Sequence, residues 1–190
     1  MMTQSLLELY NQNPARYLDT DKENPNHHYI SKLYSDEFQK YLNRDINLLE
    51  IGLGSGGSLL LWNDYFTNAK IYAIDSGTDP RFNICIDVVK DCANINLIKS
   101  DAYLPGLTDM LPNFDIIIDD GPHTKDSHLK CLDLYLPKLN PGGILIIEDI
   151  DDIEWIEDYK AKIPEGFTHS TIDTDRSLEY NNLLFLVKKI

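Results

Sequence analysis

A short apolar run that ends in a carboxylate and then in glycines constrains this chain more than any other feature. The segment is LLEIGLGSGGS at residues 48–58. This pattern predicts a buried β-strand, a tight turn and the N-terminus of a helix. In a parallel sheet, nucleotide-like ligands bind at this place, because glycine allows the backbone to approach the ligand closely.

Charge indicates which ligand the turn binds. Gly52, Gly54 and Gly57 also fit the dinucleotide pattern G-x-G-x-x-G, which alone is a weak signal. Glu50, at the tip of the strand, would repel a pyrophosphate and attract an amine. We therefore expect S-adenosylmethionine, whose methionine end carries an ammonium and a sulfonium, and NAD is the weaker interpretation. The contacts predicted in this segment are Glu50, Gly52, Gly54, Gly56 and Ser58.

Two further acids follow the next two strand-like runs. Asp75 comes after residues 70–74, and a carboxylate there can accept hydrogen bonds from ribose hydroxyls. Asp101 comes after residues 95–99, where it can accept the adenine amino group while Ala102 donates its backbone N–H to the ring. A plain turn aspartate is the alternative for Asp101.

A second group of acids lies at the ends of two later strand-like runs. The sequence DDGPH occupies residues 119–123, and Glu148 and Asp149 end the run that begins at Gly143. If these strands are neighbours, Asp120, Glu148 and Asp149 converge at the ligand-binding edge of the sheet. Three carboxylates suit a hard cation, so we expect Mg²⁺, with Mn²⁺ and Ca²⁺ left open.

His123 is the expected general base. It follows Asp120 by three residues behind a Gly-Pro turn, which can hold an imidazole beside a metal without making it a ligand. An unperturbed histidine titrates near pH 6.5, close to working pH. The alternatives are that Asp119 and Asp120 cap the next helix, that the acids from Glu148 onward favour a helix N-terminus, and that His123 is a loop residue.

Strand-like and helix-like segments alternate along the chain, which favours an α/β domain with a mainly parallel sheet. Only about ten polar residues separate the last two strand-like segments, too few for a crossover helix, so an antiparallel hairpin is expected. Residues 141–143, Pro-Gly-Gly, predict a turn before the fifth strand. Expected strands cover residues 46–51, 70–74, 95–99, 114–119, 143–148, 167–172 and 183–188, and expected helices cover residues 57–65, 80–92, 124–136 and 152–160.

The first 43 residues are expected to form a helical, lid-like extension of the same domain, and residues 44–190 its main body. Short helices are expected near residues 6–10 and 29–42. The polar stretch between them is typical of a segment that covers a bound ligand, and a surface loop with two exposed histidines is the alternative. The candidate lid or substrate residues are Lys22, His27, His28 and Tyr29.

Composition excludes several classes of protein. The chain has 190 residues, 43% of them hydrophobic, which suits one globular domain. Its formal charge of −14 opposes binding to nucleic acid. No stretch is long and apolar enough for a membrane span, and the N-terminus does not resemble a signal peptide. Cys85, Cys92 and Cys131 have no metal-binding spacing, so we expect reduced thiols and a cytoplasmic location.

Several of these segments together resemble the metal-dependent sugar O-methyltransferases, closest to the type that acts on deoxysugars of macrolide antibiotics, the mycinamicin type. Pro122 stands where the family commonly has Ser. The histidine-tyrosine segment is shifted by one residue, so either His27 or His28 is the counterpart. The segments that carry the resemblance are Asp21-Lys22, residues 27–29, Tyr34, residues 48–59, Leu61-Trp62, residues 118–123 and residues 142–149.

The resemblance, together with right-handed crossovers, implies a Rossmann-like, seven-stranded, mostly parallel sheet in the order 3-2-1-4-5-7-6, with the last strand antiparallel and helices on both faces. Macrolide enzymes carry a further N-terminal domain, which this chain is expected to lack, so a macrolide substrate is not carried over. The implied roles are Mg²⁺ binding at Asp120, Glu148 and Asp149, proton removal by His123, and S-adenosylmethionine binding at Glu50, Asp75 and Asp101.

The expected function is that of an S-adenosylmethionine- and Mg²⁺-dependent O-methyltransferase that methylates a hydroxyl of a sugar or glycan. A catechol-like acceptor is the alternative within this chemistry. An NAD-binding oxidoreductase and a non-catalytic binding protein are the alternatives from other classes. The acceptor sugar, the hydroxyl position and the formation of a homo-oligomer stay open.

Overall fold

The fold was analysed in a computed structural model that describes residues 4–17, 20–23, 27–174 and 183–190. In this part of the chain, one seven-stranded sheet has the order β3-β2-β1-β4-β5-β7-β6. Its strands are β1 (Ile46–Ile51), β2 (Ala69–Asp75), β3 (Ile95–Lys99), β4 (Phe114–Asp119), β5 (Leu139–Ile147), β6 (Phe167–Asp173) and β7 (Leu183–Lys189). The first five are parallel, and β7 is antiparallel to both β5 and β6. The predicted order and hairpin are confirmed.

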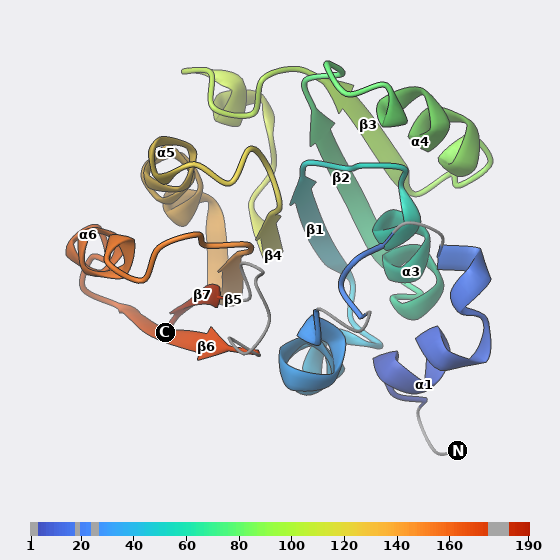
Figure 1. Ribbon diagram of the computed structural model, residues 1–190, viewed down its shortest axis with the longest axis horizontal. Helices are drawn as coiled ribbons and strands as arrows, with labels where there is room; N and C mark the ends of the chain where they lie inside the picture. Colours follow the sequence, from blue (N-terminus) through green and yellow to red (C-terminus); the bar gives the residue numbers. More distant parts are fainter. Residues whose placement is uncertain (1–3, 18–19, 24–26, 175–182) are drawn as a thin grey trace.

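Helices cover both faces of the sheet (Figure 1). On one side lie α1 (Leu6–Gln12), α3 (Gly57–Tyr65) and α4 (Arg81–Val89), and on the other lie α5 (Lys125–Tyr135) and α6 (Trp155–Ala161). The shorter helical pieces are η1 (Pro14–Tyr17), η2 (Ile30–Tyr34), α2 (Ser35–Phe38), η3 (Gln39–Tyr41), η4 (Leu107–Met110) and η5 (Leu136–Lys138). The second helix expected in the N-terminal segment is therefore a succession of short turns, among them the π-helix η2.

Alternation along the buried strands creates two cores. Leu48 and Ile116 point to the face with α3, while Leu49 and Ile117 point to the face with α5. All four side chains are fully buried. A strand covered on both faces has a mainly apolar sequence, and this pattern predicted these strands. The predicted strands 46–51, 95–99 and 114–119 match β1, β3 and β4 residue for residue.

The prediction of a turn at residues 141–143 before the fifth strand is wrong. Strand β5 already begins at Leu139 and runs through these residues. Its register against β4 shifts there, because Phe114 pairs with Leu139 whereas Ile116 pairs with Ile144. Gly142, with φ of +75°, lies in this bulge. A bulge accommodates proline and glycine within a strand, so the pattern read as a turn is an irregularity of the strand.

The N-terminal segment packs on the sheet as part of the same core. Tyr17, Tyr34 and Phe38 are buried in the cluster that contains Trp62 of α3. The ring of Phe38 stacks on Tyr34 at 4.7 Å and meets Trp62 edge-on at 5.4 Å. Between α1 and η2, the described residue Lys22 contacts Asp120 and Glu148 at the carboxyl ends of β4 and β5.

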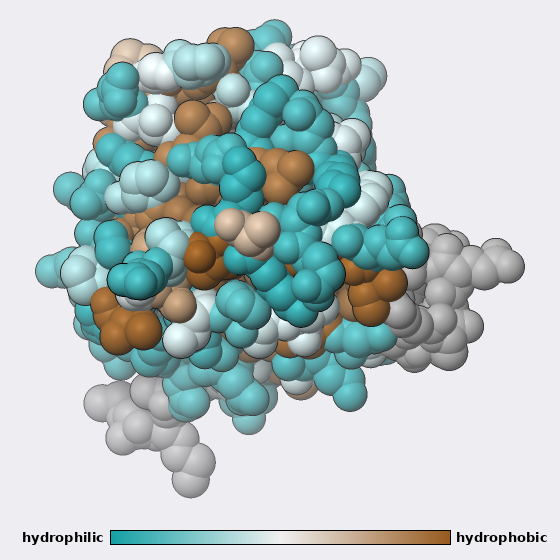
Figure 2. All heavy atoms as spheres, turned by 90° about the vertical axis from the view of Figure 1, so that its left-hand side faces the viewer, coloured by the Kyte–Doolittle hydropathy of each residue, from teal (hydrophilic) through white to brown (hydrophobic). Residues whose placement is uncertain are grey.

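None of the described helices is long and apolar enough to cross a membrane. Figure 2 shows the face that bears α5 and α6, where hydrophilic residues predominate and apolar side chains are scattered in small groups. Hydrophilic side chains therefore cover most of this face.

Candidate active site

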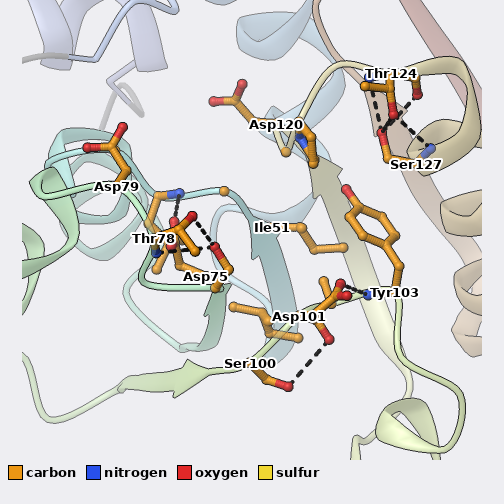
Figure 3. Close-up of a pocket in the computed structure, with 18 of the residues that line it drawn as sticks. Ile51, Asp75, Thr78, Asp79, Ser100, Asp101, Tyr103, Asp120, Thr124 and Ser127 are labelled. Atoms are coloured by element: carbon orange, nitrogen blue, oxygen red, sulfur yellow. Dashed lines mark hydrogen bonds between the residues drawn. The ribbon is translucent and has the colours of Figure 1, made fainter.

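A cavity of about 670 Å³ lies at the carboxyl ends of β1 to β4. Figure 3 shows side chains from several strand ends around this cavity. Asp75 lies at the end of β2, Asp101 and Tyr103 follow β3, and Asp120 follows β4. Of the residues predicted to bind the methyl donor, Gly52, Gly54, Asp75, Asp101 and Ala102 line this cavity.

The glycine turn after β1 is held by a close contact and by Asp75. Gly52 has φ of +80°, and a Cβ on it would lie 1.9 Å from the backbone oxygen of Asp120. Only glycine therefore fits between the two strand ends. Asp75 accepts hydrogen bonds from the backbone N–H groups of Leu53 at 3.1 Å and Gly77 at 2.7 Å. One carboxylate thus orders two turns at the rim of the cavity.

The turn after β3 is ordered in a similar way. Asp101 is exposed, and its Oδ1 accepts the backbone N–H of Tyr103 at 2.9 Å. The buried hydroxyl of Tyr135 donates to the carbonyl of Ala102 at 2.8 Å. These bonds fix the backbone of the turn, so that the acid and the N–H predicted for adenine recognition face a shaped cavity.

A second cavity of about 140 Å³ adjoins the first. The two share Leu53, Gly54, Arg81, Asp120 and Gly121. The inner cavity is also lined by Thr20, Asp21, Lys22, Gly57, Ser58 and His123. Its walls thus come from the N-terminal segment, the glycine turn and the acid cluster. Gly56 and Glu50 line neither cavity.

The structure brings Asp120, His123 and Asp149 together. One ligand atom of each lies within 4.8 Å of the others. Nε2 of His123 is 3.0 Å from Oδ1 of Asp120 and 3.6 Å from Oδ2 of Asp149. Two carboxylates at this spacing are donors that a hard divalent cation prefers, so these residues fit Mg²⁺ or Mn²⁺.

Backbone strain concentrates in the same cluster. His123 has φ of 54° and Asp149 has φ of 51°, and among the described residues other than glycine they alone have positive φ. L-residues adopt this region at a cost, and such residues gather where function over-determines the backbone. The strain turns both side chains toward Asp120.

Lys22, predicted as a candidate lid or substrate residue, is the cation at the centre of the acids, a position that the sequence did not predict. Its side chain is 1% exposed. The ammonium lies 2.9 Å from Asp120 and 2.8 Å from Glu148, and 3.4 Å from Oε1 of Glu50. Although burial opposes a charge, these three carboxylates raise the pKa of Lys22 well above its ordinary value, so the ammonium stays protonated.

Two tyrosines of the N-terminal segment complete this network. The hydroxyl of Tyr29 donates to Oδ1 of Asp149, and that of Tyr34 donates to Oε1 of Glu148. His27 stacks on Tyr29 with 5.1 Å between ring centroids. His28 lies farther out, 3.5 Å from Glu23. Lys22, Tyr29 and Tyr34 thus reach all three acids expected to hold the metal, and Glu148 faces Lys22 and Tyr34.

Glu50 is placed differently from the expectation of a direct contact in the cavity. It is fully buried at the end of β1, and its Oε2 accepts the indole N–H of Trp62 at 3.0 Å. Its Oε1 accepts no hydrogen bond from the described residues. The nearest positive charge to this oxygen is the ammonium of Lys22, 3.4 Å away, so Glu50 belongs to the buried charge network.

The acids of the cluster differ in the direction in which their surroundings shift the pKa. Burial raises the pKa of Asp149 to about 6, with help from the charge of Asp120. Burial also acts on Asp120, but Lys22 and His123 hold its pKa below the ordinary value. Burial alone would lower the pKa of His123, yet the hydrogen bond with Asp120 and the charges of Asp120 and Asp149 raise it to about 9. Asp120 is therefore the most acidic member.

Comparison with known proteins agrees with the fold and this geometry. A family described as "Methyltransferase domain" matches residues 49–150, the part that contains the glycine turn and all the expected metal-binding acids. The chain belongs to this methyltransferase family. Its sheet order, with an antiparallel last strand, is that of class I methyltransferases, so the fold implied by the resemblance is confirmed.

Two curated relatives are sugar methyltransferases by name. The 8-demethyl-8-alpha-L-rhamnosyl tetracenomycin-C 2'-O-methyltransferase of Streptomyces olivaceus is 29% identical over 80% of this chain and 43% of its own length. The mycinamicin VI 2''-O-methyltransferase of Micromonospora griseorubida is 30% identical over 67% of this chain and 33% of its own length. The chain thus spans less than half of these relatives.

A solved structure has the same fold over almost the whole chain. It is the MycE methyltransferase of the mycinamycin pathway, in complex with Mg and SAH. The TM-score is 0.73 at 23% identity, and the match covers 99% of this chain and 55% of the MycE chain. At this identity the likeness establishes the fold, including the N-terminal segment that covers the strand ends.

Proposed function

We propose that this protein is an S-adenosylmethionine-dependent O-methyltransferase that uses a divalent cation, Mg²⁺, to methylate a hydroxyl of a sugar or glycan. One observation carries the proposal. Asp120 and His123, whose ligand atoms cluster with one of Asp149, line the same joined cavities as the glycine turn and Asp75. A donor site and a hard-cation site that meet at one residue, Asp120, suit the transfer of a group to a chelated oxygen.

The residues present fit the donor at both of its ends. Asp75, Asp101 and Ala102 line the larger cavity, where ribose and adenine would bind. Ser58 lines the inner cavity. The buried carboxylate of Glu50, paired with Lys22, adds negative charge at the end of β1, which favours a positively charged donor. When bound, the donor would supply a methyl group on a positively charged sulfur, which is already activated for attack.

The lining of the inner cavity favours a polyol over an aromatic acceptor. Leu53 is the one large apolar side chain among the described residues that line it, and the others are polar, charged or glycine. A catechol would need an apolar surface for its ring. The names of the curated relatives agree, since they are methyltransferases of sugar-bearing compounds. We therefore favour a sugar hydroxyl.

His123 is the proposed general base, and its protonation decides the reaction. With a pKa of about 9, the imidazole carries a proton at neutral pH as long as Asp120 and Asp149 keep their full charge. A divalent cation on these carboxylates would lower the pKa of both the imidazole and the acceptor hydroxyl. His123 would accept the hydroxyl proton, and the bound donor would supply the methyl group to the acceptor oxygen, with S-adenosylhomocysteine as the leaving group.

Binding and turnover test this function separately. Calorimetry with S-adenosylhomocysteine is expected to give saturable binding, and NADH none. A methyl-transfer assay with S-adenosylmethionine would compare rhamnosides, nucleotide-linked sugars and a catechol. The expected result is transfer to a sugar that stops in EDTA and resumes with Mg²⁺. Full activity in EDTA would refute the proposed use of a divalent cation. Transfer to the catechol alone would refute the proposed sugar acceptor.

The compartment is part of the same proposal. Cys85, Cys92 and Cys131 are all free thiols, and two of them are buried. Unpaired cysteines suit a reducing environment. We propose that the protein acts in the cytoplasm, where S-adenosylmethionine and Mg²⁺ are both available, in the biosynthesis of a methylated glycan or glycoside.

A further inference from the structure

The hydroxyl of Tyr103 is tied to the strand that leads into the acid cluster. Tyr103 lines the larger cavity and directly follows Asp101 and Ala102. Its hydroxyl donates a 2.6 Å hydrogen bond to Oδ1 of Asp119, the last residue of β4. Asp119 is fully buried. At the end of β4, Asp119 therefore holds the turn after β3 through Tyr103, and the next residue, Asp120, belongs to the acid cluster.

Gly121 makes room for this contact. A Cβ on Gly121 would lie 2.3 Å from the hydroxyl oxygen of Tyr103 and 3.0 Å from Oδ1 of Asp119. Figure 3 shows the Tyr103 ring between the Asp101 turn and the segment that begins at Asp120, with its hydroxyl toward that segment. The chemistry proposed above uses neither Asp119 nor Tyr103, yet the fold brings them together at a wall of the cavity.

We propose that Asp119 is a positioning residue for the adenosine part of the methyl donor. It fixes the ring of Tyr103 as a wall of the larger cavity and, through Tyr103, the turn that presents Asp101 and Ala102. This inference rests on the proposed function, because it assumes that this cavity takes adenosine. A buried carboxylate that accepts a phenol forms a strong bond, and loss of either partner leaves the other unsatisfied.

Two variants test the proposal with ligands that share adenosine. Tyr103→Phe removes only the hydroxyl, and Asp119→Asn removes only the charge. Each is expected to weaken binding of S-adenosylhomocysteine about tenfold, and 5′-methylthioadenosine by the same factor, because the lost order concerns the common adenosine. The double variant should bind about as weakly as the weaker single variant, since both changes act on the same hydrogen bond. Calorimetry measures all of these constants without turnover.

Tyr65→Phe is the matched control, because the buried hydroxyl of Tyr65 has no hydrogen-bond partner among the described residues. Its affinity for both ligands should stay within twofold of wild type, and the Mn²⁺ affinity of Tyr103→Phe should do the same. If Asp119→Asn does not fold, Tyr103→Phe still decides. Wild-type affinity in Tyr103→Phe, or a loss for S-adenosylhomocysteine alone, would overturn the inference. A wild-type chain that binds neither ligand would overturn the proposed function as well.

Discussion

The two ends of the site are built in opposite ways. At the acid end, Lys22, Glu50 and Glu148 are almost completely buried, and side chains bond to side chains across three strand ends. At the adenosine end, Asp101 is exposed and Asp75 is half-buried, and both hold backbone N–H groups of turns. The acid end therefore depends on every partner being present, whereas the adenosine end depends on the shape of its turns.

The largest expected effect is on turnover at the acid end. His123→Ala removes the proposed base, so the rate should fall by about 10²- to 10⁴-fold. Binding of S-adenosylhomocysteine should change by less than about threefold, because His123 does not line the larger cavity, where adenosine would bind. A methyl-transfer assay and calorimetry measure the two quantities. His169→Ala, on the exposed strand β6, is the control. Near-normal turnover would rule out His123 as the base.

The next effect is on stability at the acid end. Lys22→Met keeps the length of the side chain but leaves three buried acids without their counter-ion. A broken buried ion pair costs about 3–5 kcal/mol. Urea unfolding of the metal-free protein should detect this loss. Lys162→Met, which breaks an exposed pair with Asp133, should cost less than about 1 kcal/mol. Equal losses of unfolding free energy in the two variants would contradict the claim that the buried network contributes more to stability than an exposed ion pair.

A smaller effect is expected at the adenosine end. Asp101→Asn keeps an oxygen for the N–H of Tyr103 but weakens an acceptor that adenine would use, so affinity for S-adenosylhomocysteine should fall by about tenfold or less. The free energy of unfolding should stay within about 0.5 kcal/mol of wild type, as is usual for exposed positions. Calorimetry and urea unfolding give both values. Large destabilisation would show that this end is as interdependent as the acid end.

The last effect concerns a buried histidine outside the site. Burial lowers the pKa of His128 to about 4, and its Nδ1 lies 2.7 Å from the hydroxyl of Tyr159. In the unfolded chain a histidine binds a proton near pH 6.5, so the unfolded state takes up the proton first and stability is lost as pH falls from about 6.5 to 4.

Acid unfolding compares His128 with a side chain that does not titrate. His128→Gln should lose less stability than wild type between pH 6.5 and pH 4, and the two should have the same slope above pH 7. Asp119 and Asp149, whose pKa values burial raises to about 6, are present in both proteins and cancel in the difference. Identical slopes throughout would mean that His128 is as accessible to protons when folded as when unfolded.

Much of the fold could be predicted because local sequence patterns indicate its strands. Residues 46–51 and 114–119 are mainly apolar runs with an acid at or next to their last residue, and a helical segment follows each of them. The ligand edge followed from that topology, which placed Asp75, Asp101 and Asp120 at strand ends. The bulge at Gly142 was misread as a turn because both conformations use glycine in the same way.

The network around Lys22 could not be predicted in the same way. A lysine in a polar stretch reads as exposed, and its burial depends on three acids that lie 28, 98 and 126 positions later, at Glu50, Asp120 and Glu148. Likewise, Glu50 was expected to face the donor, but its neighbours Trp62 and Lys22 surround it. Pairing between distant segments decides such contacts. The one local signal was Lys22 within the segment that resembles the sugar methyltransferases.

A crystal structure of the protein with S-adenosylhomocysteine and Mn²⁺, with anomalous diffraction to locate the manganese, tests the central claim most directly. That claim is that donor and cation meet at Asp120. The account predicts one manganese peak contacting Asp120 and Asp149, and S-adenosylhomocysteine in the larger cavity with its sulfur toward that peak. A manganese site away from both carboxylates, or a ligand bound outside the joined cavities, would contradict it.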